Sequence, residues 1–223
     1  MTGAELRIIL DRALELVAKN EDELRDLDSA IGDGDLGITV SRSAQTARLS
    51  MAALPPGSTP SEVIRTLATA IASANPSSFA ALVATGLLAA SRSISESGSL
   101  TASDVVTMAQ QAVPAIAKRG KAELGDKTVL DALVPSIAAL EASTSDGALA
   151  AMIAAARKGI DDTAQSVSRK GRAAWQGERT IGHPDPGATA YLRFLEALQQ
   201  AWSEVGLPEK RDQGHHPRES RLT

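Results

Sequence analysis

The 223-residue sequence contains no cysteine, which excludes disulfide bonds, thiolate metal sites and cysteine nucleophiles. It also has no apolar run approaching the roughly 20 residues that span a bilayer. No basic, then apolar, leader of the secretory type stands at its start. These absences predict a soluble protein of the reducing cytoplasm with no membrane partner.

Neither sign of charge dominates, because 23 basic and 27 acidic residues give a net charge of −4. Such a chain has too weak a field to attract nucleic acid or an anionic membrane. Aromatic residues make up only 2% of the chain, so small and medium aliphatic side chains must fill the core. Alanine, which recurs throughout, has the highest helix propensity and lets helix axes approach closely. The composition therefore favours closely packed helices.

Apolar residues recur at helical spacing, and no segment alternates with the period of two that marks a strand. The pattern predicts an all-α fold of eight or nine helices in an antiparallel up-and-down bundle, with one domain over residues 1–207. An almost uncharged segment beginning at Ser77 predicts a central helix. Residues 208–223 are expected to form a disordered tail. The predicted helices are Gly3 to Lys19, Glu21 to Ile31, Gly37 to Leu54, Ser61 to Ala74, Ser77 to Ser95, Asp104 to Lys118, Thr128 to Leu140, Ala148 to Lys170 and Gly187 to Val205.

Four segments are polar or glycine-rich where a helical bundle needs only a turn. They are Asp28 to Thr39, Asn75 to Phe79, Gly120 to Asp131 and Gly171 to Gly187. In an up-and-down bundle, loops separated by an even number of helices lie at the same end. We therefore expect one end of the bundle to carry the function.

The first of these segments concentrates three aspartates, Asp28, Asp33 and Asp35. Carboxylate oxygens are the ligands that hard divalent cations select, and Mg²⁺ usually takes one or two carboxylates together with phosphate oxygens and waters. Gly34 frees the backbone to bend around an ion. The alternative is that the aspartates serve as helix caps and turn formers, which are common roles for Asp beside Gly.

Two helix starts favour a phosphate ligand. Gly37, Ile38 and Thr39 open one predicted helix, and Ser77 and Ser78 open another. Backbone N–H groups and the positive end of the helix dipole suit an anion at such a place. A serine at a helix start is, however, more often simply a cap.

The third and fourth segments also contain polar groups. Asp126 and Thr128 can cap the helix that follows, and Thr128 with Asp131 has the spacing of a capping box. In the fourth segment, the guanidinium of Arg172 could bind a phosphate with two parallel hydrogen bonds. Irregular backbone of this length exceeds what a connection between two helices requires.

Three motifs, LDSAIGDGDLG, RGKAELGDKTVLDALVP and KGRAAWQGERTIGHPDPGATA, together resemble one family. The sequence is similar to the ADP-binding (L) subunit of dihydroxyacetone kinase and to the equivalent domain of single-chain ATP-dependent kinases. The resemblance extends to about residue 205. It implies an eight-helix antiparallel barrel that holds ADP or ATP and two Mg²⁺ ions at one end.

The resemblance also assigns site residues. It implies that Asp28, Asp33 and Asp35 bind the metal ions and that catalysis is electrostatic and positional, without a catalytic side chain. Gly120 and Val129 match positions around the adenine. The implied nucleotide-binding residues are Leu36, Gly37, Ile38, Thr39, Ser77, Ser78, Gly120, Val129, Arg172, Asp185, Pro186 and Gly187.

The resemblance further implies a partner, a K subunit that holds the hydroxyketone substrate. The phosphoryl donor would be ATP or a phosphotransferase-system protein that rephosphorylates bound ADP. Association of the chain as a homodimer is a further possibility. Two positions depart from the family pattern. Leu36 stands where the pattern has histidine, and ANPSSFA replaces a GGxSG loop. These departures favour the alternative of a catalytically silent regulatory or adaptor protein; a metal-dependent phosphohydrolase is a third hypothesis.

Overall fold

A computed structural model describes residues 1–94, 98–143 and 147–206 of the chain. The described residues confirm the all-α prediction, with one isolated β-bridge between Thr2 and Ser99. The predicted tail and the predicted helix end at Ser95 lie outside them. None of the described helices is long and apolar enough to cross a membrane. The helices are α1 (Gly3–Val17), α2 (Glu21–Ile31), α3 (Leu36–Ala52), α4 (Pro60–Ala74), α5 (Ser78–Ser91), α6 (Ala102–Gly120), α7 (Leu130–Ala142), α8 (Ala148–Ala164) and α9 (Pro186–Val205), with short 3-10 helices at Ala18–Asn20 and Ala173–Thr180.

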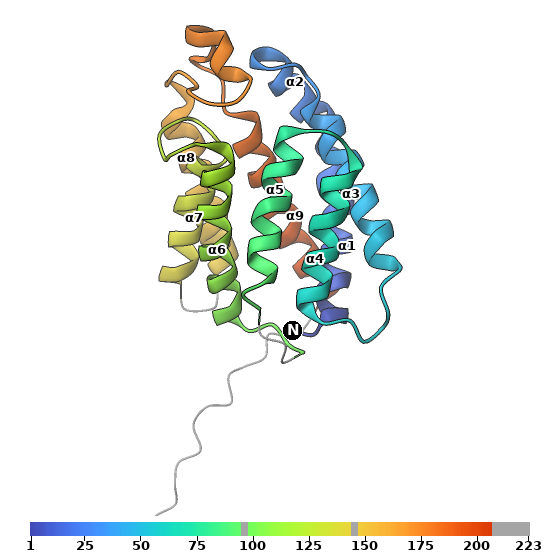
Figure 1. Ribbon diagram of the computed structural model, residues 1–223. Helices are drawn as coiled ribbons and strands as arrows, with labels where there is room; N and C mark the ends of the chain where they lie inside the picture. Colours follow the sequence, from blue (N-terminus) through green and yellow to red (C-terminus); the bar gives the residue numbers. More distant parts are fainter. Residues whose placement is uncertain (95–97, 144–146, 207–223) are drawn as a thin grey trace, which may run out of the picture.

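Eight of the described helices form a closed antiparallel ring. Each of α3 to α9 packs against its neighbours in chain order, and α1 closes the ring by packing against both α3 and α9. The short α2 lies at one end, where it contacts α3 and α9 (Figure 1). The connections after α2, α4, α6 and α8 all lie at the upper end in this view, as expected for an up-and-down barrel. The ring thus brings the four unusual segments together.

Helix starts follow the local sequence closely. Thr2 and Thr59 each accept a hydrogen bond from the backbone N–H of the glutamate three residues later, whose carboxylate binds the threonine N–H in return. The same capping box, with Asp104 in place of glutamate, fixes Thr101 as the residue before α6. Pro60 then supplies the favoured first residue of α4.

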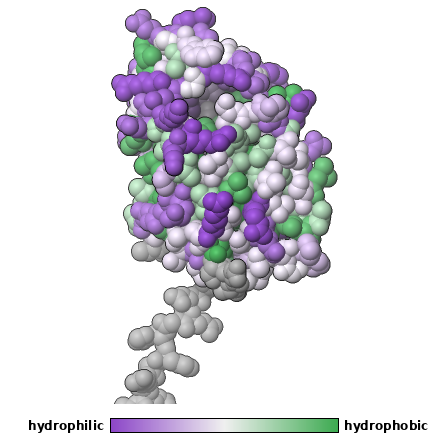
Figure 2. All heavy atoms as spheres, viewed as in Figure 1, coloured by the Kyte–Doolittle hydropathy of each residue, from purple (hydrophilic) through white to green (hydrophobic). Residues whose placement is uncertain are grey.

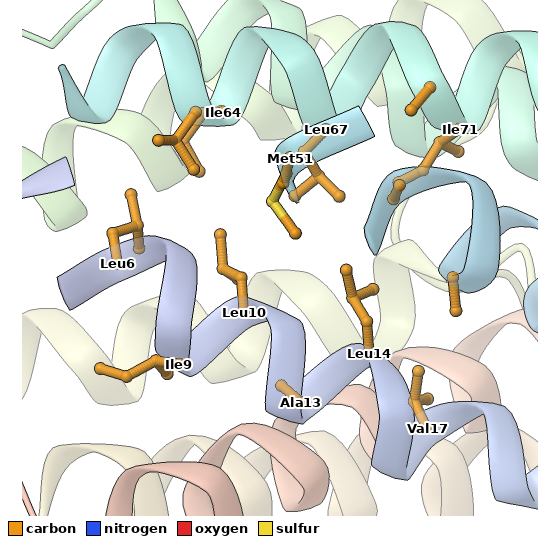
Figure 3. Packing of buried hydrophobic residues seen from close by; sticks show 14 of the residues in the cluster. Leu6, Ile9, Leu10, Ala13, Leu14, Val17, Met51, Ile64, Leu67 and Ile71 are labelled. Atoms are coloured by element: carbon orange, nitrogen blue, oxygen red, sulfur yellow. The ribbon is translucent and has the colours of Figure 1, made fainter. Parts of the chain in front are cut away.

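The largest apolar cluster lies between α1, α3 and α4. Leu10 and Leu14 of α1 point toward Leu67 and Ile71 of α4, with Met51 of α3 beside them (Figure 3). Full burial of such a side chain contributes roughly 1.5–3 kcal/mol to stability. This aliphatic cluster contains no residue of the four loops, so it holds α1, α3 and α4 together independently of them.

Several predicted helix ends shift by one or two residues, and three differences have an identifiable physical cause. The helix predicted from Ala148 to Lys170 ends at Ala164, because hydrogen bonds from outside the helix take up carbonyl oxygens at its end. The helix predicted from Thr128 begins at Leu130, since the backbone N–H of Thr128 is bound by a side chain of the next turn. The predicted central helix, α5, is instead one wall of the ring between α4 and α6.

Candidate functional site

A cavity of about 520 Å³ opens at the end of the barrel where the four loops meet. Hydrophilic side chains gather at this end of the molecule (Figure 2). Most of the residues predicted to form the site line the cavity, so the fold brings together groups that lie far apart in the sequence. These residues are Asp28, Asp33, Asp35, Leu36, Ser77, Ser78, Gly120, Val129, Arg172, Asp185, Pro186 and Gly187.

The three aspartates form a compact cluster at the cavity. One carboxylate oxygen from each of Asp28, Asp33 and Asp35 lies within 4.8 Å of the others. Asp28 comes from the last turn of α2, and the turn that follows contains Gly34 in a left-handed conformation with φ of 76°. This φ favours glycine, and an added Cβ would also require the hydroxyl of Ser29, 2.5 Å away, to move.

The alternative reading of these aspartates as caps accounts for only one of them. Asp28 Oδ2 accepts a hydrogen bond of 3.2 Å from the backbone N–H of Leu36, at the start of α3. Asp35 occupies the position before α3 but makes no capping hydrogen bond with its side chain. Burial, and then the charge of Asp28, raise the pKa of Asp35. An all-oxygen cluster of mutually repelling carboxylates fits a hard divalent cation such as Mg²⁺.

Arg172 supplies positive charge to this cluster from the other side of the cavity. Its guanidinium forms salt bridges with Asp33 and, at 3.2 Å, with Asp35. These ion pairs are well exposed to solvent, so they contribute little to the stability of the fold. They do place Arg172 where it can reach both the aspartates and a bound anion.

Gly37, Ile38 and Thr39, which follow Leu36 in the first turn of α3, lie outside the cavity lining. A Cβ added to Gly37 would lie 2.1 Å from the backbone oxygen of Glu21, so this glycine permits close packing of α3 on α2. Ile38 is exposed, whereas Thr39 is buried and its hydroxyl accepts a hydrogen bond of 2.9 Å from the amide of Asn75. Nucleotide contacts at Gly37, Ile38 and Thr39 therefore stay predictions.

The floor of the cavity is apolar at the position where the family pattern has histidine. Leu36 is only 5% exposed and packs with Leu24 and Ala190, and the ring of Phe79 leans against this cluster. Ser77 acts as a cap, because its hydroxyl accepts a hydrogen bond of 3.5 Å from a backbone N–H of α5. The side chain of Leu36 therefore cannot donate a hydrogen bond to a ligand in the cavity.

Asp185 caps α9 at the opposite wall. Its Oδ2 accepts a hydrogen bond of 2.7 Å from the N–H of Ala188. Burial raises the pKa of Asp185 from an ordinary value near 3.8 to about 7, and the nearby charge of Asp131 adds to this effect. Hydrogen bonds from backbone N–H groups and the charge of Lys127 oppose it.

We expect Asp185→Asn to remove a pH dependence of stability. Between about pH 4 and pH 7, native Asp185 retains a proton that the unfolded chain has released, so this residue lowers stability as pH rises through that window. The difference between the pKa of Asp185 in the unfolded chain and in the folded protein corresponds to roughly 4 kcal/mol of stability. We expect about half of this change to be observed, because the cavity admits solvent. Asparagine still caps a helix well.

Urea denaturation of both proteins at intervals across that window measures the effect. The free energy of unfolding of Asp185→Asn minus that of the unchanged chain should increase with pH up to about pH 7. Above that pH the difference should remain constant. Asp161→Asn, at an exposed position on α8, serves as the control. Curves for Asp185→Asn and the unchanged chain that run parallel would refute this role of burial.

Several residues at this end were not singled out from the sequence. Arg119 and Lys170 line the cavity, each directly before a glycine that also lines it, and Lys170 lies 3.8 Å from Asp126. Both residues could have been found from the sequence, because each is a basic residue directly before a glycine in one of the four polar segments. Lys127 was not predicted, because the partners of its buried ammonium group, the backbone oxygens of Ala164, Ser166 and Thr180, are far from it in the sequence.

Comparison with known proteins identifies the family. A family model described as the DAK2 domain matches residues 30–200. The ADP-binding subunit DhaL of the PEP-dependent dihydroxyacetone kinase of Escherichia coli K12 is 30% identical over 87% of this chain and 95% of that subunit. The L-erythrulose 1-kinase of Mycolicibacterium smegmatis is also 30% identical, over 85% of this chain and 34% of that kinase. The crystal structure of the dihydroxyacetone kinase from C. freundii in complex with AMP-PNP and Mg²⁺ has the same fold, with a TM-score of 0.70 and 24% identity over 89% of this chain and 34% of that one. The chain is thus a member of the DAK2 domain family.

Proposed function

We propose that this chain is the nucleotide- and Mg²⁺-binding subunit of a dihydroxyacetone-type kinase, which acts on a short-chain ketose. The observation that carries the proposal is the cluster of three carboxylates at the mouth of a cavity of about 520 Å³. Membership of the DAK2 domain family supports it, as does the match to an ADP-binding subunit along nearly its whole length.

In this proposal the residues of the cavity divide the work. Asp28, Asp33 and Asp35 would hold two Mg²⁺ ions, which when bound supply charge neutralisation to the phosphates of ADP or ATP. Arg172 would bind the phosphates in addition, since a guanidinium suits phosphate geometry. The backbone at Gly120, with its missing side chain, would leave room for the base.

The remaining parts of the reaction would belong to other proteins. The human triokinase/FMN cyclase matches this chain at 30% identity, yet the match covers only 34% of that enzyme. We therefore assign the hydroxyketone site to a partner K subunit, without which this chain would not transfer a phosphoryl group. The donor would be ATP or a phosphotransferase-system protein, and self-association as a homodimer is part of the same proposal.

A second candidate function rests on the apolar cavity floor. Leu36 cannot donate to a phosphate, and Pro76 lacks a backbone N–H in the loop before α5. Both changes favour a catalytically silent member that acts as a regulatory or adaptor protein. The retained aspartates favour the kinase subunit, because Arg172 alone cannot neutralise three neighbouring carboxylates, which repel one another.

Isothermal titration calorimetry separates the two functions. The purified chain, freed of any co-purified nucleotide, is titrated with ADP and with ATP in the presence and absence of Mg²⁺. The kinase subunit should bind at least one of these nucleotides only when Mg²⁺ is present. No binding under any of these conditions would refute it and favour the silent protein.

A further inference from the structure

Lys127 is a lysine buried completely, with an exposed fraction of 0%. Lysine is almost never fully buried unless its charge has partners, because removing an ammonium group from water is costly. Its backbone is left-handed, with φ of 60°, in the loop between α6 and α7. A residue that combines these two unfavourable features needs a specific structural reason.

The reason lies in the partners of the ammonium group. Its Nζ donates hydrogen bonds to the backbone oxygens of Ala164 and Ser166, both at 2.9 Å, and of Thr180 at 2.6 Å. These bonds use all three donors of an ammonium group. Ala164 is the last residue of α8, where the helix dipole favours a positive charge.

The three oxygens mark the two ends of one stretch of chain. Ala164 and Ser166 stand at its beginning, and Thr180 is the last residue of the 3-10 helix that ends it. The stretch itself runs over residues 165–180 and is called the clamped segment below. Lys170, Gly171 and Arg172 of this segment line the cavity. Lys127 is absent from the cavity lining, so it cannot contact a ligand there directly.

The loop that carries Lys127 is itself firmly held. Both carboxylate oxygens of Asp131 accept hydrogen bonds from this loop, one from the N–H of Gly125 at 2.6 Å and one from the N–H of Thr128 at 2.8 Å. The backbone oxygen of Asp126 accepts a further bond of 3.0 Å from the N–H of Arg169, inside the clamped segment. The ammonium group therefore projects from a rigid base.

We propose that Lys127 is a positioning residue for the nucleotide site, whose ammonium group fixes the clamped segment and thereby holds Arg172 at the aspartates. The proposal rests on the proposed function, since it concerns how that site is assembled. Removal of the ammonium takes this donor from all three oxygens, of which that of Ala164 keeps a bond from the N–H of Gly182 and that of Thr180 keeps one of 3.2 Å from the N–H of His183. The segment then loses a link at both ends.

The electrostatic surroundings agree with a charged ammonium. Burial lowers the pKa of Lys127, and the charge of Asp185 opposes this effect. Three backbone oxygens and the end of a helix dipole add negative potential around Nζ. A neutral side chain of the same length would fill the same space without binding these oxygens.

The direct test is Lys127→Met, made in a chain that also contains Trp202→Phe. Trp175 is then the single tryptophan, it lies inside the clamped segment, and it is 89% exposed. We expect time-resolved fluorescence anisotropy to show wider nanosecond motion of Trp175. We also expect the affinity for Mg²⁺·ADP to fall about tenfold, the range seen for residues that orient a ligand-binding group. Lys121→Met is the matched control, because Lys121 is a left-handed but exposed lysine in the same loop.

A double-mutant comparison tests whether Lys127 acts through Arg172. In an Arg172→Ala background, Lys127→Met should change the affinity for Mg²⁺·ADP by less than about twofold, because the group to be positioned is already gone. Equal losses in both backgrounds would show a general structural effect and overturn the proposal. Unchanged Trp175 motion in folded Lys127→Met would also overturn it.

The absence of cysteine from this chain permits a chemical rescue. Lys127→Cys, alkylated in the unfolded chain with 2-bromoethylamine, regains an ammonium group at this position alone, whereas 2-bromoethanol gives a neutral side chain of similar length. After refolding, the ammonium form should return the motion of Trp175 and the affinity for Mg²⁺·ADP to the values of the chain with Lys127. The neutral form should keep the wider motion and the weaker binding. If only the ammonium form folds, Lys127 determines the fold rather than the site, which overturns the proposal. If the unchanged chain binds no Mg²⁺·ADP, the proposed function fails, but the motion of Trp175 still decides the role of Lys127.

Discussion

Asp33→Asn should lower the affinity for Mg²⁺·ADP by at least about 100-fold, or roughly 2.7 kcal/mol. The amide occupies the same space but lacks the negative charge with which a carboxylate attracts Mg²⁺. It also removes a partner of Arg172, which then pairs with Asp35 alone. Isothermal titration calorimetry measures the affinity, and the dependence on Mg²⁺ should disappear with it.

The fold should survive this change. Asp33 is exposed, so the free energy of unfolding measured by urea denaturation should change by no more than about 0.5 kcal/mol. Asp26→Asn is the matched control, since Asp26 belongs to α2 close to Asp28 but forms its salt bridge with Arg25 on the outer surface. If Asp33→Asn bound Mg²⁺·ADP as tightly as Asp26→Asn does, the aspartate cluster would not be the metal site.

Gly37→Ala should destabilise the protein by about 3 kcal/mol. Alanine alone would favour the helix by up to about 1 kcal/mol, but the added Cβ must displace backbone atoms. It would lie 2.1 Å from the oxygen of Glu21 and 2.9 Å from the nitrogen of Arg25, both in α2. Helix α3 must therefore move away from α2, which also shifts Asp35 and weakens Mg²⁺·ADP binding.

Thermal and urea denaturation measure the stability of this variant. A loss of about 3 kcal/mol corresponds to a fall in Tm of roughly 6–12 °C for a chain of this size. Gly57→Ala is the control, because an added Cβ at Gly57 has no neighbour within 4 Å. Equal Tm values for the two variants would mean that α3 can accommodate the methyl group and that the close packing has no energetic importance.

Local sequence patterns predicted the features that local interactions determine. The cap at Thr101 could be predicted, because a capping box needs only residues within one turn. The aspartate cluster could be predicted because its members lie on one short loop and because the surrounding motifs resemble a known family. The location of the four loops at one end followed from counting helices in an up-and-down arrangement.

Features that depend on distant segments could not be predicted in this way. The end of α8 at Ala164 is determined by hydrogen bonds from Lys127 and Gly182, which lie outside the helix. Gly37 was interpreted as a phosphate contact, but its lack of a side chain is also required by the packing of α2. The sequence alone does not show whether a glycine or a lysine in a polar loop serves packing or ligand binding. That distinction requires knowledge of its tertiary neighbours.

The salt bridges between Arg172 and the aspartates have a thermodynamic consequence for loading of the proposed site. A divalent cation that enters there competes with a counter-ion already in place, so metal binding is an ion exchange rather than a simple addition. A nucleotide phosphate offers the guanidinium another anion and thus frees the carboxylates. Metal and nucleotide must then increase each other's affinity by the same factor, as reciprocal linkage requires.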